Sequence, residues 1–226
     1  MSKNGGTPTQ QRHWEQVFAS HPTMYGEVAS LPAQHAIGLF RGHDVYDVLE
    51  LGAGQGRDSL AFLAAGFTVT ALDYAASALR ELRTRAAEVG SADRLRTAQH
   101  DVRVPLPLPD CSVDAVFSHM LFCMALTTAE LVTLSAEVAR VLRPGGLHVY
   151  TVRHVGDAHY GQGTAHGDDR WESGGGFIVH FFDRALVDQL AAGFEVLEIA
   201  DFEEGVLPRR LWRITEQRGS SERPGR

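Results

Sequence analysis

Three glycines and an aspartate are the residues of this chain that most clearly suit the binding of a small molecule. Gly52, Gly54 and Gly56 occupy alternate positions directly after the apolar run that begins at Val45. Without a Cβ atom, each position allows the backbone to turn and to approach a ligand closely. Asp73 ends the next apolar run, 21 residues after Gly52. A glycine-rich turn between a strand and a helix most often binds a nucleotide-like ligand.

Two phosphate-binding motifs are excluded by the residues that follow this turn. Counted from Gly52, the dinucleotide fingerprint GxGxxG needs a glycine where the chain has Arg57. A Walker-type phosphate loop needs Gly-Lys followed by Ser or Thr, and that sequence does not follow here. A nicotinamide-dependent oxidoreductase is therefore disfavoured.

Polar residues also end two later apolar runs. Ser118 and His119 follow VDAVF, and Arg153 follows LHVYTV. Ligands of open α/β sheets lie outside the carboxyl ends of the strands, so we expect these side chains near the pocket. With a pKa of about 6.5, an imidazole is half available as a base near neutral pH, so His119 is either a general base or a pocket wall. Arg153 is a candidate for holding an anionic substrate.

The elements that must position these residues alternate between strand and helix. Apolar runs bounded by turns predict strands, and apolar residues spaced at three and four predict helices. Strand and helix in this rhythm imply parallel strands joined by right-handed crossovers. The sequence predicts strands at 45–51, 67–72, 95–98, 113–118 and 147–153, helices at 12–20, 31–41, 58–65, 75–90, 131–142 and 186–192, and a terminal antiparallel hairpin of 194–204 with 211–217.

The composition indicates one soluble α/β domain with a small-molecule partner. The chain has 226 residues, of which 44% are hydrophobic and 22% charged, and this is enough for one substantial core. The formal net charge of −7 argues against nucleic-acid and membrane partners, which select clustered Lys and Arg. Two cysteines without CxxC spacing suggest no disulfide framework. We expect a cytoplasmic monomer or homodimer, without a signal or a membrane-spanning segment.

The ends of the chain and two segments near the predicted pocket complete the expected domain organisation. Residues 1–11 and 217–226 are polar and are expected to be disordered, which leaves a domain over 12–216. Residues 12–30 and the glycine-rich stretch 154–176 are expected to act as lid elements. Within the first, Trp14 and Tyr25 are candidates for closing over a ligand, although aromatic residues at helical spacing more often belong to a core.

No metal site is predicted. Several histidines and aspartates have side chains that can ligate metals, but no spacing among them matches an established site, and a solvated loop explains them better. They are His13, His21, His159, His166, Asp168 and Asp169.

The stretch from Glu50 to Gly56, together with Asp73, resembles motif I and the acidic residue of the class I S-adenosylmethionine-dependent methyltransferases. The resemblance extends over roughly residues 12–216 and includes His100-Asp101-Val102, the Arg-Pro-Gly-Gly turn that starts at residue 143, and the terminal hairpin. It implies a Rossmann-like three-layer sandwich, with a mostly parallel seven-stranded sheet and a C-terminal antiparallel hairpin.

The resemblance also implies roles for individual residues toward S-adenosylmethionine. Asp73 would accept hydrogen bonds from both ribose hydroxyls, Asp101 would accept from the adenine amino group, and the Val102 backbone would meet the adenine ring. Glu50 would orient the loop. The implied cofactor-binding set is Trp14, Glu50, Gly52, Ala53, Gly54, Gly56, Arg57, Asp73, Tyr74, Asp101, Val102, Ser118 and His119, and the catalytic candidates are Tyr25, His119 and Arg153.

Within this family the chain looks closest to the small tellurite-resistance-type and thiopurine-type methyltransferases, through residues 56–73 and 175–190. This implies methyl transfer to a small-molecule nucleophile, with a thiol or another soft chalcogen favoured and O or N possible. Family members that methylate exocyclic amines carry Asn or Asp, two prolines and an aromatic where this chain has SHML at 118–121, so such amines are disfavoured. The alternative is a protein of the same fold that binds S-adenosylmethionine without catalysis.

Overall fold

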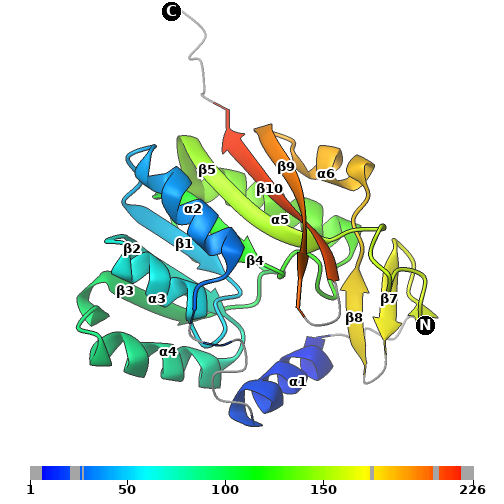
Figure 1. The fold of residues 1–226 in the computed structure, drawn as a ribbon, viewed down its shortest axis with the longest axis horizontal. Coiled ribbons are helices and arrows are strands. Elements are labelled where there is room, and N and C mark those ends of the chain that lie inside the picture. The colour runs from blue at the N-terminus through cyan, green and yellow to red at the C-terminus, as the bar shows by residue number, and fades with distance from the viewer. Residues whose placement is uncertain (1–6, 21–25, 27, 174–175, 206–208, 220–226) are drawn as a thin grey trace, which may run out of the picture.

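A central seven-stranded sheet organises the molecule (Figure 1). The computed structural model describes residues 7–20, 26, 28–173, 176–205 and 209–219. The strand order is β3-β2-β1-β4-β5-β10-β9, with β1 to β5 parallel and β10 antiparallel to both of its neighbours. These strands are β1 (Asp47–Leu51), β2 (Thr68–Asp73), β3 (Leu95–Gln99), β4 (Val113–His119), β5 (Leu142–Arg153), β9 (Phe194–Glu204) and β10 (Arg209–Arg218). The expected fold class is confirmed.

Helices cover both faces of this sheet and make the three layers (Figure 1). On one face their apolar sides form a core with Phe40, Phe62 and Leu82, and on the other a core forms around Leu134 and Val187. The first face carries α2 (Leu31–Arg41), α3 (Arg57–Ala64) and α4 (Ala76–Glu88), and the second carries α5 (Thr128–Val141) and α6 (Arg184–Leu190).

Local sequence explains where these helices begin. At α5, the Thr127 side chain accepts from the Glu130 backbone N–H, and Glu130 accepts from the Thr127 backbone in return, which is a capping box. At α2, Ser30 accepts from the Ala33 backbone N–H, and a proline occupies the first turn, where no donor is needed. The two caps satisfy backbone groups that would otherwise lack partners.

The N-terminal and C-terminal elements extend further than the sequence predicted. Helix α1 (Thr7–Ser20) begins within the stretch 1–11 that was expected to be disordered, and β10 continues to Arg218. The rest of both expected tails, 1–6 and 220–226, lies outside the described residues. Helix α1 packs against α4, beneath the sheet in Figure 1, because Glu15 accepts from the Ala76 backbone at 2.6 Å.

Two further predictions of local structure need correction. The Arg-Pro-Gly-Gly stretch lies inside β5 rather than before it, since Leu142 already pairs with Val113 and the register then shifts. The segment 154–176, predicted without regular structure, contains most of a small antiparallel sheet, because Trp171 and Glu172 pair with strands on both sides. Its strands are β6 (Thr164–Ala165), β7 (Arg170–Ser173) and β8 (Phe177–His180), and a short 3-10 helix, η1 (Ala92–Arg94), precedes β3.

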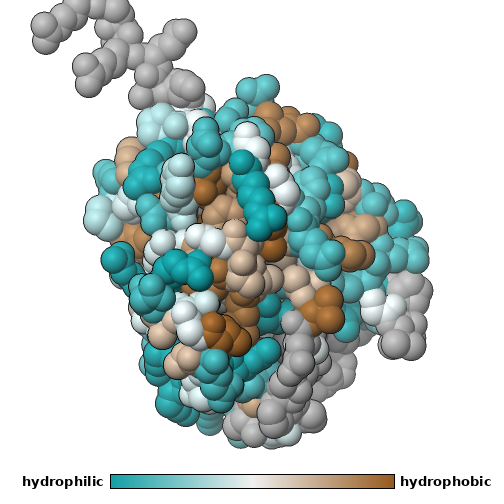
Figure 2. All heavy atoms as spheres, turned by 60° about the vertical axis from the view of Figure 1, so that its left-hand side comes forward, coloured by the Kyte–Doolittle hydropathy of each residue, from teal (hydrophilic) through white to brown (hydrophobic). Residues whose placement is uncertain are grey.

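The surface combines hydrophilic and hydrophobic areas. On the face that Figure 2 shows, hydrophobic residues gather in the middle and hydrophilic ones surround them. None of the described helices has the length and apolar character that a bilayer crossing requires.

Gly56 provides a test of the packing between the glycine loop and α4. Its φ is +83°, and a Cβ there would come within 2.2 Å of the Leu82 side chain. Strain in the left-handed region and overpacking should together lower the free energy of unfolding of Gly56→Ala by about 3 kcal/mol. Gly90→Ala is the matched control, because φ is +68° but nothing lies within 4 Å, so that strain alone should cost about 1 kcal/mol. Urea unfolding measures both, and equal losses would contradict the packing argument.

Candidate functional site

A cavity of about 390 Å³ opens where the parallel strands β1, β2 and β4 end. This is the place at which open α/β sheets bind ligands. Its lining combines the glycine loop, strand-end carboxylates and apolar side chains. The residues are Gln10, Trp14, Phe18, Gly26, Glu50, Gly52, Ala53, Gly54, Gln55, Arg57, Asp58, Leu72, Asp73, Tyr74, Arg85, His100, Asp101, Val102, Arg103, His119, Met120, Leu121, Met124, Ala125, Leu126, Phe177, Glu204, Gly205 and Arg209.

The glycine loop exposes bare backbone to this cavity. Gly52 and Gly54 have φ angles of +74° and +53°, and their missing Cβ atoms would lie 3.2 Å from atoms of Leu121 and Phe18, respectively. The backbone N–H of Gly52 donates to the Leu72 carbonyl at 2.8 Å, which ties the loop to β2. Gly56 is absent from the described lining, and its small size serves packing against α4 instead of ligand approach.

Asp73 joins the end of β2 to the glycine loop. Its Oδ2 accepts from the Gly54 N–H at 2.8 Å, and its Oδ1 accepts from the Ala75 N–H at 2.8 Å. Burial raises the pKa of Asp73 to about 6, although both N–H donors favour the ionised form. Because each carboxylate oxygen has two lone pairs, the group can still accept from a ligand in the cavity.

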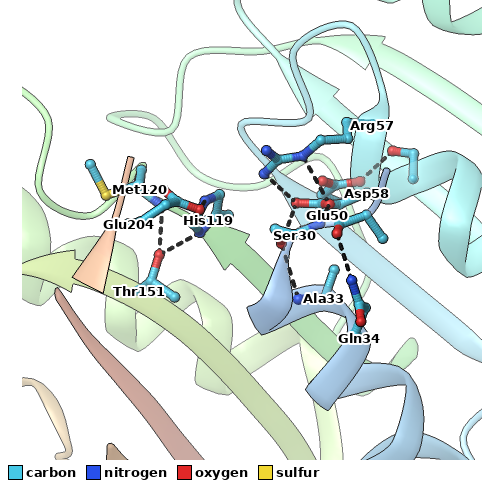
Figure 3. A network of polar contacts seen from close by, with 12 residues as sticks. Ser30, Ala33, Gln34, Glu50, Arg57, Asp58, His119, Met120, Thr151 and Glu204 are labelled. Atoms are coloured by element: carbon cyan, nitrogen blue, oxygen red, sulfur yellow. Dashed lines mark hydrogen bonds and ion pairs between the residues drawn. The ribbon is translucent and has the colours of Figure 1, made fainter. Parts of the chain in front are cut away.

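Glu50 belongs to β1 and lines the same cavity as Asp73. A second polar network holds its side chain (Figure 3). The Ser59 hydroxyl pairs with the Glu50 carboxyl, and Asp58 accepts from the Ser30 backbone N–H at 2.8 Å and from Arg57 at 3.1 Å. Burial, reinforced by the Asp58 carboxylate, raises the pKa of Glu50 well above its ordinary value. The orienting role expected for Glu50 stays a prediction.

The segment after β3 supplies the opposite end of the cavity. Asp101 and Val102 line it as predicted, together with Tyr74 from the end of β2. Arg103 pairs with the Asp101 carboxylate at 3.1 Å and with Glu130 at 3.4 Å. The side chain of Asp101 is thereby held at the cavity wall by a neighbouring positive charge.

Helix α1 and strand β8 close one side of the cavity with aromatic rings. Trp14 lies 5.5 Å from Phe18 and 6.0 Å from Phe177, measured between ring centroids. All three side chains line the cavity, and Gln10 of α1 also donates to the Gly176 carbonyl at 2.8 Å. Trp14 therefore lines the cavity from α1, and its covering role stays a prediction.

His119 reaches the cavity at the end of β4, between two partners (Figure 3). Its Nδ1 is 2.8 Å from the Thr151 hydroxyl, and its Nε2 is 3.3 Å from the Glu204 carboxylate. The next residue, Met120, has a φ of +65°, and its N–H donates to the same Thr151 oxygen at 3.0 Å. This left-handed conformation is uncommon for a large side chain, and Thr151 stabilises it.

Besides Gly56, two of the expected site residues that the structure describes are absent from the cavity lining. Arg153 is 7% exposed and directs its guanidinium to Asp157 at 2.6 Å and onto the Phe181 ring, and it is absent from the described lining. Ser118 is fully buried in the sheet and is likewise absent from that lining. Tyr25 lies outside the described residues.

Two important site residues were missed by the sequence analysis. Glu204 ends β9 and Thr151 lies within β5, so each is far from the glycine loop in the sequence. The alternating pattern of the terminal hairpin could have indicated which strand positions share a face of the sheet, but not that Glu204 reaches His119. Among the described residues, no cluster of three or more His, Cys, Asp or Glu is placed to hold a metal ion.

Comparison with known proteins finds similarity to methyltransferases. Residues 48–146 match the family model of a methyltransferase domain. Over 148 residues the chain is 36% identical to a malonyl-(acyl-carrier protein) O-methyltransferase of Methylococcus capsulatus, covering 61% of this chain and 50% of that protein. The corresponding protein of Pectobacterium atrosepticum is 32% identical over 125 residues, covering 54% and 45%, respectively. The chain thus spans about half the length of the curated relatives it matches.

Solved structures share the fold over nearly the whole chain. The 1,6-didemethyltoxoflavin-N1-methyltransferase of Burkholderia thailandensis, solved with S-adenosylhomocysteine, has a TM-score of 0.71 at 18% identity and covers 97% of this chain and 94% of its own. A 4+2 cyclase, SpnF, has a TM-score of 0.67 at 17% identity, covering 93% and 95%. Residues 48–146 are thus similar to a methyltransferase domain, and the chain as a whole shares the fold of these solved structures.

The raised pKa of Asp73 makes a pH-dependent prediction for S-adenosylhomocysteine. If the ionised carboxylate accepts from the ribose hydroxyls, protonation competes with binding below the pKa of about 6. The dissociation constant should then rise about tenfold for each pH unit below this value and stay level above it. Asp73→Asn should bind more weakly at pH 7 and lose the pH dependence. Calorimetry between pH 5 and 8 measures both, and equal wild-type affinity at pH 5 and 7 would contradict the assignment.

Proposed function

We propose that this protein transfers the methyl group of S-adenosylmethionine to a small-molecule nucleophile. One observation carries the proposal: a single cavity combines the bare backbone of Gly52 and Gly54, the carboxylate of Asp73 and a separate polar group at His119. A cofactor with a ribose and an amino-acid end suits the first two features. The third leaves a polar position for a second ligand.

The residues present fit this cofactor. A side chain at Gly52 or Gly54 would enter the space beside Leu121 or Phe18, so the loop keeps room for close approach. Asp73 retains lone pairs for a diol, and Asp101 offers a carboxylate to an amino group. When bound, S-adenosylmethionine supplies an electrophilic methyl group on a sulfonium. The chain's own contribution is then to align the acceptor and to exclude water.

The walls of the cavity support a compact, partly apolar acceptor. Met120, Leu121 and Met124 come from the segment after β4, and Phe177 and Trp14 face them from the covering elements. Such walls exclude water from the reacting atoms and position an acceptor by shape. The sequence-based preference for a thiol or another soft chalcogen, and for the tellurite-resistance-type or thiopurine-type branch, stays a prediction.

A second candidate is a protein that binds the cofactor without transferring its methyl group. The structural similarity to the 4+2 cyclase favours keeping this alternative, since it shows that a protein named for different chemistry shares this fold. The two functions differ in turnover and not in cofactor binding.

Calorimetry and mass spectrometry together test the proposed function. We expect S-adenosylmethionine and S-adenosylhomocysteine to bind, and a screen of thiols, hydroxyls, amines and oxyanions to yield a product heavier by one CH₂ group. Binding without any product would support the non-catalytic alternative. Failure of both ligands to bind would refute the whole proposal.

The aromatic cover offers a more local test of the same proposal. Removing the indole in Trp14→Ala opens the side of the cavity where it contacts Phe18 and Phe177. We expect the dissociation constant of S-adenosylhomocysteine to rise about tenfold, which corresponds to about 1.4 kcal/mol of lost contact. Trp171→Ala, at a ring that packs on Tyr160 away from the cavity lining, is the control. Equal affinities of the Trp14 variant and the wild type would contradict a covering role.

A further inference from the structure

Glu204 is a cavity carboxylate to which the cofactor assignments give no role. It ends β9, and Figure 3 shows its side chain beside His119. The side chain lines the cavity and is 30% exposed. By contrast, Glu50 and Asp73 are buried, with 3% and 7% of their surface exposed. Glu50 accepts from the Ser59 hydroxyl, and Asp73 accepts from the backbone N–H groups of Gly54 and Ala75. Glu204 Oε1 contacts His119 at 3.3 Å. Its Oε2 has no hydrogen-bond partner among the described residues and can accept from a ligand.

The neighbours of Glu204 keep it ionised. His119 contacts it directly, and the positive charges of Arg57 on α3 and Arg209 on β10 act on it from the two sides. The hydrogen bond from His119, against the opposing effect of burial, lowers the pKa of Glu204 below its ordinary value. An ionised carboxylate therefore faces the cavity at neutral pH.

The partners of His119 leave its ring no free lone pair. Thr151 Oγ1 already accepts from the Met120 N–H, so its own proton is available for His119 Nδ1 at 2.8 Å. The ionised Glu204 can only accept, so the imidazole proton belongs on Nε2, facing the carboxylate at 3.3 Å. In this arrangement the hydrogen bonds that run from Thr151 through His119 to Glu204 occupy both ring nitrogens of His119. Of these three residues, Glu204 is the one with an oxygen, Oε2, that can still accept a proton.

We propose that Glu204 is the catalytic base of this site and takes the proton of a neutral O–H or N–H acceptor, while His119 and Thr151 are positioning residues that orient it. The inference rests on the proposed function. The expected acceptors are then neutral compounds with a hydroxyl or an N–H group. This differs from the sequence-based prediction, which favoured a thiol or another soft chalcogen.

The transfer balances with the groups named. The acceptor's lone pair forms a bond to the methyl carbon, the carbon–sulfur bond breaks with its electrons on sulfur, and the acceptor's O–H or N–H proton passes to Glu204. S-adenosylhomocysteine and a methylated acceptor result, and the proton on Glu204 leaves to solvent. The acceptor becomes strongly acidic only as its new bond forms, so a weakly basic carboxylate suffices.

The same carboxylate disfavours the alternative acceptors. A thiol with a pKa near 8.5 needs little help from a base, and its reactive thiolate would be repelled by an adjacent Glu204. An oxyanion would meet the same repulsion. A neutral protic acceptor instead gains a charge-assisted hydrogen bond before transfer.

The activity test compares Glu204→Gln with Glu203→Gln. Glu203 is the neighbouring glutamate of β9, is exposed and lies on the opposite side of the strand. Four probes are used: phenol, imidazole, benzenethiol and phenylacetate, each with saturating S-adenosylmethionine. We expect methylated phenol or imidazole, a turnover about 100-fold lower in Glu204→Gln, and an unchanged rate in Glu203→Gln. S-adenosylhomocysteine affinity should stay within about twofold in both variants.

The pH profile separates Glu204 from His119 as the base. With Glu204, wild-type turnover at saturating cofactor stays level from about pH 8 to 6, whereas a histidine base would lose half its rate near about 6.5. Thr151→Val removes the hydroxyl that contacts His119 Nδ1. That variant should therefore lower turnover while leaving the affinity for S-adenosylhomocysteine unchanged, a split that a merely structural role would not produce.

Nitrogen NMR of the imidazole gives a readout without turnover. In labelled protein bound to S-adenosylhomocysteine, His119 should carry its proton on Nε2, toward Glu204. A proton on Nδ1 would overturn the inference. So would methylation confined to benzenethiol or phenylacetate, full activity of Glu204→Gln, or absence of any product from a protein that binds S-adenosylhomocysteine. Absence of that binding would instead refute the proposed function itself.

Discussion

The bond between the Gly54 N–H and the Asp73 carboxylate is the interaction on which the site depends. It joins the glycine loop after β1 to the end of β2, and the Gly52 N–H reinforces it by donating to the Leu72 carbonyl. The two strands are adjacent and parallel, so their carboxyl ends arrive at the same edge of the sheet. The loop can then expose its backbone while a buried carboxylate stands beside it.

Because β1 lies in the middle of the parallel strands, the site residues fall into two groups, one on each side of it. The strands on one side of β1 present the residues proposed to bind the cofactor, with Asp73 on β2 and Asp101 after β3. The strands on the other side present His119 on β4, Thr151 on β5 and Glu204 on β9. The first group forms through local connections, whereas the second requires the complete sheet, including the antiparallel hairpin.

The same division shows how far the sequence could predict the structure. The spacing of Gly52 and Asp73 is set by one strand–helix–strand unit, so local pattern predicted the fold and indicated residues that line one cavity. Glu204 escaped prediction because the twist and length of a distant hairpin bring it to His119. Arg153 was predicted at the site because it ends a strand, but Asp157 in the following turn binds its guanidinium. Pattern identifies strand ends, and tertiary pairing decides which of them face the ligand.

A crystal structure with S-adenosylhomocysteine tests the central claim most directly. The account predicts both ribose hydroxyls within hydrogen-bond distance of the Asp73 carboxylate, the adenine near Asp101 and Val102, and the sulfur turned toward His119. Binding at another place, or a ribose without contact to Asp73, would contradict it.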